Sequence, residues 1–297
     1  MAIEDKVFSG DTLRVGYRFQ RHWDNSMAYA FFCAELGAGL FFVSLLMDNV
    51  AGMILGLVPV ATGKPYFHLS HMGVPARSWR AALRPDRSWI SRGLLGLSAL
   101  IGCGAALVFC LLFGSSFGIE ADSALVNLLK VLAGIFALVT MTYQGFAMSH
   151  SSAIAIWNSA ILPLASFLYA LATGVSVLLV ITAGGSNDLA DALLLLLLAL
   201  GAMHLMLLHA GWHGSPGART SVELLLQTLY AKWFWGLTVA AGILLPGLLL
   251  WWAPDLLLTQ LVACLGILAG FMAWRILIFK IGVYEPIMSM NPFNPLH

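Results

Sequence analysis

Three side chains that can hold oxygen atoms or move protons lie in or beside long apolar segments, namely Glu35, His71 and Tyr143. Histidine can donate or accept a hydrogen bond near neutral pH, and a tyrosine hydroxyl can do either as well. A carboxyl group inside an apolar segment is costly, so Glu35 must be paired, protonated or next to a hydrated cavity. Together these groups suit a site that binds two oxygen atoms of a ligand and passes protons to water.

The composition around these residues excludes a soluble protein. Of the 297 residues, 60% are hydrophobic and 10% are charged, and the mean hydropathy is +0.88. Such a chain could not cover its surface with polar groups in water. We therefore expect an all-α integral membrane protein in contact with membrane lipid, and the net charge of +1 gives no reason to expect a nucleic-acid partner.

Apolar stretches of about 20 residues, enough to cross roughly 30 Å of hydrocarbon, divide the chain into spans. We predict eight spans, at 27–47, 49–69, 91–113, 123–148, 157–182, 189–212, 231–251 and 256–279. An even number of spans places both termini on the same side of the membrane.

The charged residues divide unequally between the two sides. Every Lys and Arg except Lys130 falls on the side of the termini, whereas the opposite loops carry Asp and Glu. The positive-inside rule therefore predicts cytoplasmic termini in a bacterial cytoplasmic membrane. A basic face that docks an acidic subunit would produce the same asymmetry, and Lys130 would snorkel from within the fourth span.

The segment 66–92 is the longest polar stretch between two spans and holds five of the fifteen Lys and Arg residues. If 76–84 is α-helical, its arginines lie on one face, as in a basic helix at a membrane surface. Pro85 would end this helix, and Ser88 would cap the next one. The arginines that would dock a partner, or simply hold this loop on one side, are Arg77, Arg80, Arg84 and Arg87.

Two other features of the spans bear on ligands. Gly37 and Gly39, close to Glu35, would permit close approach of another helix or of a ring-shaped ligand. Arg275 and Lys280, near the end of the last span, would bind lipid phosphate or a partner subunit, or act as anchors.

Metal ligands are sparse. The four cysteines lie in apolar spans without a CxxC pair, so they cannot bind an iron–sulfur cluster, and a redox metal would have to come from a partner or a haem. His204 and His209 in the sixth span are the residues that would ligate haem b. Two axial ligands must come from facing helices, and few other histidines lie in spans, so we expect neither haem nor metal in this chain.

Four motifs occur in order along the spans. They are HMGVP followed by the arginines and SWISRG, then YQGFAMS, then WNSAILPLASFLYALATG, and then FWGLTVAAGILLPGLL. From Trp23 to Arg275 the chain resembles the polysulfide and dimethyl sulfoxide reductase membrane-anchor family, also called NrfD-like or DmsC-like. The resemblance implies eight helices in two four-helix bundles that bind menaquinone or ubiquinone. It also implies two partners, a ferredoxin-like iron–sulfur subunit and a molybdopterin catalytic subunit.

The resemblance also implies a domain division and roles for single residues. The expected parts are a polar segment 1–26, a first bundle 27–150 with the quinone site, a second bundle 151–282, and an extended tail 283–297 lying over a partner. His71 matches the histidine of an HLGxP turn associated with quinol binding, although Met72 replaces the leucine. The other matched residues are Tyr143 at the mouth of the pocket, where Gln144 follows in place of threonine, and His22 and Asn25 of an HWxN stretch.

Glu35 is not assigned from the resemblance and is nominated as a proton relay on physical grounds alone. Two other functions stay open. A secondary transporter would also have paired helical halves and a buried carboxylate, but its polar groups should gather at mid-membrane. A purely structural anchor would keep its partners assembled without binding quinone. The sequence leaves open both the substrate of the catalytic partner and the direction of electron flow.

Overall fold

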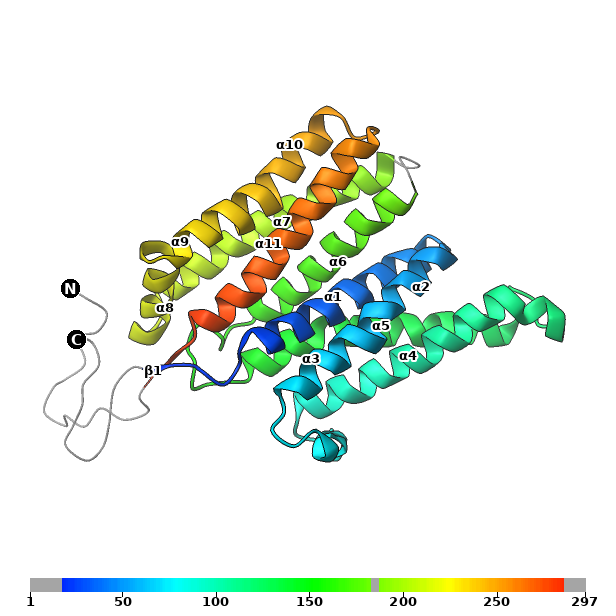
Figure 1. The fold of residues 1–297 in the computed structure, drawn as a ribbon, viewed down its shortest axis with the longest axis horizontal. Helices are drawn as coiled ribbons and strands as arrows, with labels where there is room; N and C mark the ends of the chain where they lie inside the picture. Colours follow the sequence, from blue (N-terminus) through cyan, green and yellow to red (C-terminus); the bar gives the residue numbers. More distant parts are fainter. Residues whose placement is uncertain (1–17, 183–186, 286–297) are drawn as a thin grey trace, which may run out of the picture.

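The computed structural model describes residues 18–182 and 187–285, which are almost entirely helical (Figure 1). Eight helical spans in these residues are long and apolar enough to cross a membrane, which confirms the predicted all-α, eight-span fold. The first four are α1 (Asn25–Leu46), α2 (Val50–Val58) continued by η2 (Pro59–Gly63) and α3 (Lys64–His71), α4 (Trp89–Phe113) continued by η4 (Gly114–Phe117), and α5 (Ala124–Ser149). The last four are α6 (Ile161–Ile181), α7 (Asn187–Trp212), α9 (Tyr230–Trp233) continued by η5 (Phe234–Leu244) and α10 (Leu245–Trp252), and α11 (Leu257–Lys280).

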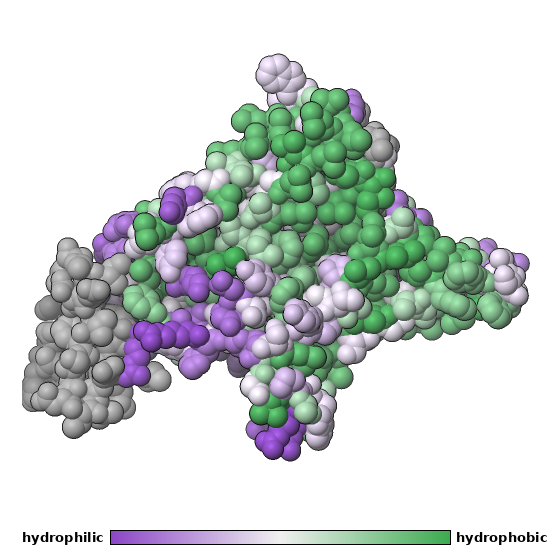
Figure 2. All heavy atoms as spheres, viewed as in Figure 1, coloured by the Kyte–Doolittle hydropathy of each residue, from purple (hydrophilic) through white to green (hydrophobic). Residues whose placement is uncertain are grey.

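The surface of the spans is apolar. Large exposed hydrophobic side chains occur along the spans, for example Leu198, Leu248 and Leu265. Figure 2 shows this apolar surface over the middle of the molecule, with hydrophilic residues gathered towards the end that carries β1 (Arg18–Phe19) and at the tip formed by η3 (Pro75–Ala82). Helices suit such surroundings because each satisfies its own backbone hydrogen bonds where no water is present.

Local cap chemistry sets where several helices begin. Asp24 accepts hydrogen bonds from the N–H groups of Ser26 and Met27 at the start of α1. Ser88 accepts one from the Ser91 N–H, so the predicted cap of the third span is confirmed. Such side chains satisfy N–H groups that have no partner within the helix.

The second span is not a uniform α-helix. It passes through the π-helical η2, where the Lys64 N–H bonds the Pro59 carbonyl, before it continues as α3. A π-turn holds more residues than an α-turn, so it changes the face on which all later side chains lie. The side chains of α3 therefore point in directions that a plain α-helical wheel does not give.

The loop after α3 differs from the prediction. It forms a 3₁₀-helix, η3 (Pro75–Ala82), and not an α-helix over 76–84. Arg77 and Arg80 lie on one edge, because a 3₁₀-helix has three residues per turn, whereas Arg84 lies beyond the helix. Arg84 also precedes Pro85, a position that disfavours α-helical backbone.

Two hydrophobic clusters fill the interior. One contains Phe41, Met53 and other residues of the first four spans. The other contains Phe271 and Trp274 with residues from the last four spans and one face of α1. Helix α1 thus contributes to both clusters and lies beside α6 and α11 (Figure 1). The division into two four-helix bundles, 27–150 and 151–282, stays a prediction.

The two ends of the described chain meet on one face. Strand β1 (Arg18–Phe19) pairs antiparallel with β2 (Val283–Tyr284), and the Gln20 amide donates to the Phe279 carbonyl. A short helix, α8 (Pro216–Gln227), lies at the same end, where Ser215 donates to Glu285. Most of the predicted segment 1–26 and of the tail 283–297 lies outside the described residues.

Gly39 is where α1 and α6 approach most closely. A Cβ on Gly39 would lie 1.8 Å from the Ala170 carbonyl oxygen, and one on Gly174 would lie 2.4 Å from the Gly39 carbonyl carbon. The expected close approach of a second helix at this glycine is therefore present. Backbone atoms cannot move aside as a flexible side chain can, so these glycines keep the two halves in contact.

We predict that Gly39→Ala destabilises the protein by about 1–3 kcal/mol, because the added methyl group forces α1 and α6 apart. Detergent-induced unfolding of the purified protein measures the effect. Gly102→Ala is the matched control, since no atom lies within 4 Å of the Cβ it would add. Equal unfolding midpoints for the two variants would contradict the prediction.

Candidate functional site

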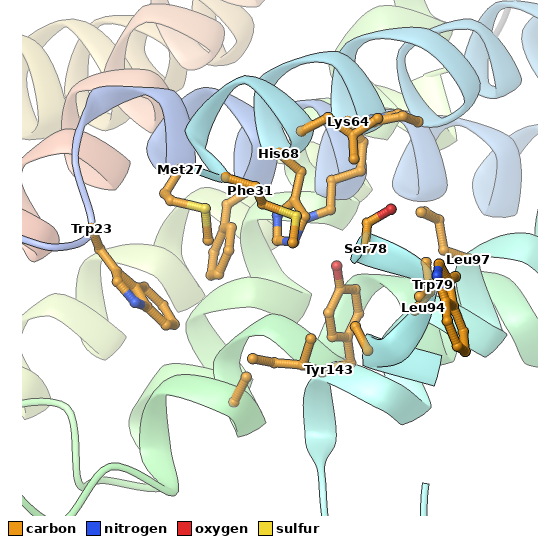
Figure 3. Close-up of a pocket in the computed structure, with 16 residues that line it drawn as sticks. Trp23, Met27, Phe31, Lys64, His68, Ser78, Trp79, Leu94, Leu97 and Tyr143 are labelled. Atoms are coloured by element: carbon orange, nitrogen blue, oxygen red, sulfur yellow. The ribbon is translucent and has the colours of Figure 1, made fainter. Parts of the chain in front are cut away.

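A cavity of about 310 Å³ lies at the end of the first four spans that η3 covers. Its walls come from the start of α1, from α3, η3 and the start of α4, and from the end of α5 (Figure 3). Most of the lining is apolar or aromatic and includes Trp23, Phe31, Trp79, Leu94 and Leu97. The cavity can therefore hold an apolar, ring-sized group.

The polar residues that line this apolar space are Ser78 of η3 and three larger ones, Lys64, His68 and Tyr143. Figure 3 shows the polar ends of the three larger side chains pointing towards one another from α3 and α5. Lys64 Nζ lies 4.9 Å from the centre of the Phe31 ring and 5.5 Å from that of Tyr143. Neither Lys64 Nζ nor His68 Nδ1 has a hydrogen-bond partner in the described part of the chain. The described chain therefore leaves both of these buried atoms with unused hydrogen-bonding capacity.

Tyr143 is the predicted site residue that lines the cavity. A Cβ on Gly93 would lie 1.9 Å from the Tyr143 ring, so the ring packs against α4 only because residue 93 is glycine. Gln144 Nε2 donates to the Tyr143 hydroxyl over 3.4 Å. The hydroxyl therefore keeps its own hydrogen for donation to a ligand oxygen.

The other predicted quinone-binding residues lie outside the cavity lining. His71 ends α3 with Nδ1 3.2 Å from Asp24 Oδ1, and His22 and Asn25 are exposed. His68 occupies the cavity instead. The sequence interpretation treated Lys64 only as a topological charge, although Lys64 and His68 are four residues apart, the spacing that places two side chains on one helical face.

Glu35 is completely buried and paired. Arg275 of α11 donates to both of its carboxylate oxygens, over 2.8 and 2.5 Å, and also to Ser166 of α6 over 2.8 Å. The pair therefore joins three helices in the interior. The prediction that Arg275 binds lipid phosphate or a partner is wrong, because its side chain is only 1% exposed. The proton-relay role of Glu35 stays a prediction.

Phe31 is close both to this ion pair and to the cavity. Phe31 lines the cavity and has Lys64 Nζ 4.9 Å and Arg275 Cζ 5.9 Å from its ring centre. Both cations are close enough to be attracted by the ring's π-electrons. The Glu35–Arg275 pair and the Lys64 ammonium therefore both lie near Phe31. Arg275 has a charged partner, whereas Lys64 Nζ has no hydrogen-bond partner among the described residues.

The two candidate haem ligands have different surroundings. His204 is buried, with Nε2 3.2 Å from the Tyr169 hydroxyl and Nδ1 2.8 Å from the Leu200 carbonyl oxygen. His209 is exposed, with its ring centre 4.6 Å from that of His213. Both ring nitrogens of His204 are engaged, which does not favour haem ligation. Among the described residues, no group of three or more His, Cys, Asp or Glu side chains could hold a metal ion.

The arginine-rich loop covers one side of the cavity. Ser78 and Trp79 of η3 line the cavity, and the loop is tied to α4 by a hydrogen bond from the Ser91 hydroxyl to the Ala81 carbonyl. Arg92 also donates to the carbonyl groups of Pro85 and Asp86. The arginines predicted to dock a partner are all exposed, namely Arg77, Arg80, Arg84 and Arg87. One short segment thus closes the cavity and presents positive charge outward.

We predict that Arg275→Met costs about 3–5 kcal/mol of stability, because Glu35 would remain buried without its partner. The double variant Glu35→Leu/Arg275→Met should recover most of this loss, since neither charge is then left in the apolar interior. Detergent-induced unfolding measures all three proteins.

Lys130→Met is the control for this experiment, because Lys130 pairs with the largely exposed Asp48 over 2.6 Å. Loss of such an exposed pair should cost less than about 1 kcal/mol. A double variant no more stable than Arg275→Met would show that the unpaired Glu35 charge is not the cause of the lost stability.

Comparison with known proteins agrees with this architecture. The family model described as polysulphide reductase, NrfD, matches residues 16–285. Proteins of that family are quinone-interacting membrane subunits of oxidoreductase complexes. None of the curated proteins matches the chain. Because the family match covers nearly the whole sequence, the chain belongs to the polysulphide reductase NrfD family.

Proposed function

We propose that this chain exchanges electrons between the membrane quinone pool and a docked iron–sulfur subunit, which in turn connects to a molybdopterin catalytic subunit. One observation carries the proposal. An apolar, ring-sized cavity has Lys64, His68 and Tyr143 among its lining residues and lies beneath an exposed basic loop. Family membership supports the same function.

The residues present fit a quinone. A quinone head is a flat ring with two oxygen acceptors and an apolar tail, and sites for such ligands are mostly apolar with a few placed polar groups. Trp23, Phe31 and Trp79 provide aromatic walls, and Tyr143 and His68 provide hydrogen-bonding groups. Menaquinone and ubiquinone share these features, so the cavity suits either one.

Quinol oxidation releases two electrons and two protons, and quinone reduction takes up the same number. The Tyr143 hydroxyl would donate a hydrogen bond to one ligand oxygen, and the His68 imidazole would accept or return one proton at the other, while the second proton would be exchanged with water. The electrons would pass to or from the iron–sulfur subunit. Glu35 is proposed to assist proton movement, because its partner Arg275 lies next to Phe31, which lines the cavity.

The basic loop supports a docking site for the iron–sulfur subunit. Its arginines are exposed, whereas Trp79 in the same 3₁₀-helix lines the cavity. A partner held by these charges would therefore lie directly over the quinone site, which keeps the electron path short. Complementary charge at such a surface mainly speeds encounter and fixes orientation. By the positive-inside rule this face, with the partner, is cytoplasmic.

We predict that Tyr143→Phe lowers kcat/KM for quinol or quinone by roughly tenfold, because one hydrogen bond to the ligand is lost. The assay uses the assembled complex in native membranes with a short-chain quinone. Tyr66→Phe is the matched control, since Tyr66 is 68% exposed and does not line the cavity. Equal kinetics for the two variants would argue for a purely structural anchor.

Experiments on the same complex also test the alternative that the chain is a secondary transporter. Quinone-dependent reduction or oxidation of the iron–sulfur subunit supports the proposed function. Solute uptake by the isolated chain in liposomes, without quinone-dependent electron transfer in the complex, would overturn it.

We predict that Arg77→Gln/Arg80→Gln weakens association with the iron–sulfur subunit by roughly tenfold at low ionic strength and reduces the salt dependence of binding. Surface-immobilised binding over a range of salt concentrations measures both effects. Arg219→Gln/Lys232→Gln removes the same charge from exposed residues away from this loop and serves as the control. An identical loss in the two variants would show that only net charge matters.

A further inference from the structure

Lys64 is an unusual lysine for the edge of a membrane span. Lysine side chains near helix ends normally extend to water, but Lys64 is only 3% exposed. Its Nζ has no hydrogen-bond partner in the described part of the chain. Burying an ammonium group without a partner is costly, so its position requires an explanation.

The backbone holds Lys64 in this inward position. The π-turn η2 sets the direction of the first residue of α3 through the bond from the Lys64 N–H to Pro59. The neighbouring Gly63 packs so closely on α1 that a Cβ there would lie 2.7 Å from Cys33 Sγ. These contacts fix the start of α3 against α1, and the side chain enters the cavity.

Nearby charges do not neutralise Lys64. The buried carboxylate that interacts electrostatically with Lys64 is that of Glu35, but Arg275 already binds both of its oxygens. The Phe31 and Tyr143 rings lie near the ammonium and attract it, but they accept no conventional hydrogen bond. A negatively charged or strongly accepting ligand atom is therefore the missing partner.

We propose that Lys64 is the main determinant of ligand affinity and selectivity in this cavity, and that its ammonium binds one oxygen of the ring ligand. The cavity then favours rings whose oxygen carries negative charge over neutral rings of the same size. The inference rests on the proposed quinone site and adds to it the group that selects the ligand. An ammonium offers three donors and a full charge, whereas a phenol hydroxyl offers one donor and an imidazole at most two.

Two ligands of equal ring size test the selectivity. In 2-hydroxy-1,4-naphthoquinone the hydroxyl group is acidic and ionised at neutral pH, whereas 2-methyl-1,4-naphthoquinone is neutral. Equilibrium binding of each is measured on the assembled complex in lipid nanodiscs. We expect Lys64→Met to weaken binding of the anionic ring by roughly 10- to 100-fold, as for loss of a hydrogen bond to a charged group. The same substitution should weaken binding of the neutral ring by a smaller factor.

Two further variants separate charge from other effects. Lys64→Gln keeps a donor without charge, so it should restore part of the affinity for the neutral ring but not for the anionic one. Lys130→Met removes an ammonium that is paired with Asp48 outside the cavity, and it should bind both rings as the wild type does.

Stability without ligand provides a second readout. Because Lys64 is buried without a partner, Lys64→Met should unfold at the same denaturant concentration as the wild type or a higher one. A clear loss of stability in the ligand-free protein would identify Lys64 as a structural residue and overturn the inference.

The binding results distinguish the role of Lys64 from the existence of the quinone site. If the wild type binds both rings and Lys64→Met binds them equally well, the role of Lys64 is refuted and the quinone site stands. If the wild type binds neither ring, the quinone site itself is refuted, and the inference with it.

Discussion

A charge buried in an apolar interior is costly unless it is paired, and Glu35 and Arg275 pair with each other at the point where three helices meet. Arg275 binds both carboxylate oxygens and Ser166, so α1, α6 and α11 meet at one hydrogen-bonded point. Where these helices meet, the α1 backbone at Gly39 can approach α6 without a side chain between them. The position of α1 then places Phe31, one wall of the cavity.

Two buried cations lie near the Phe31 ring, and they differ in whether the chain provides a partner. Arg275 is matched by a carboxylate from its own chain and contributes to holding the helices together. Lys64 has no such match in the described part of the chain and faces an apolar cavity. Internal pairing stabilises the fold, whereas the buried Lys64 ammonium would gain a partner only from a bound ligand, as proposed above.

The loop between the second and third spans forms part of the cavity wall and also carries the exposed basic surface. Its 3₁₀-helix supplies Trp79 to the cavity and carries exposed arginines on the outer side. Hydrogen bonds from Ser91 and Arg92 of α4 hold this loop against the helix ends. A lipid-soluble ligand and a water-soluble partner would therefore meet the same short segment from opposite sides.

The sequence alone was enough to determine the class, the eight spans, the Ser88 cap and the family resemblance, because hydropathy, cap chemistry and motif order are local along the chain. It also identified Tyr143, but it selected His71 where the structure places His68 and Lys64 in the cavity. Only the tertiary structure could decide these points. A π-turn changes the face on which the α3 side chains lie, and the partner of Glu35 is 240 residues away, so no local pattern records either one.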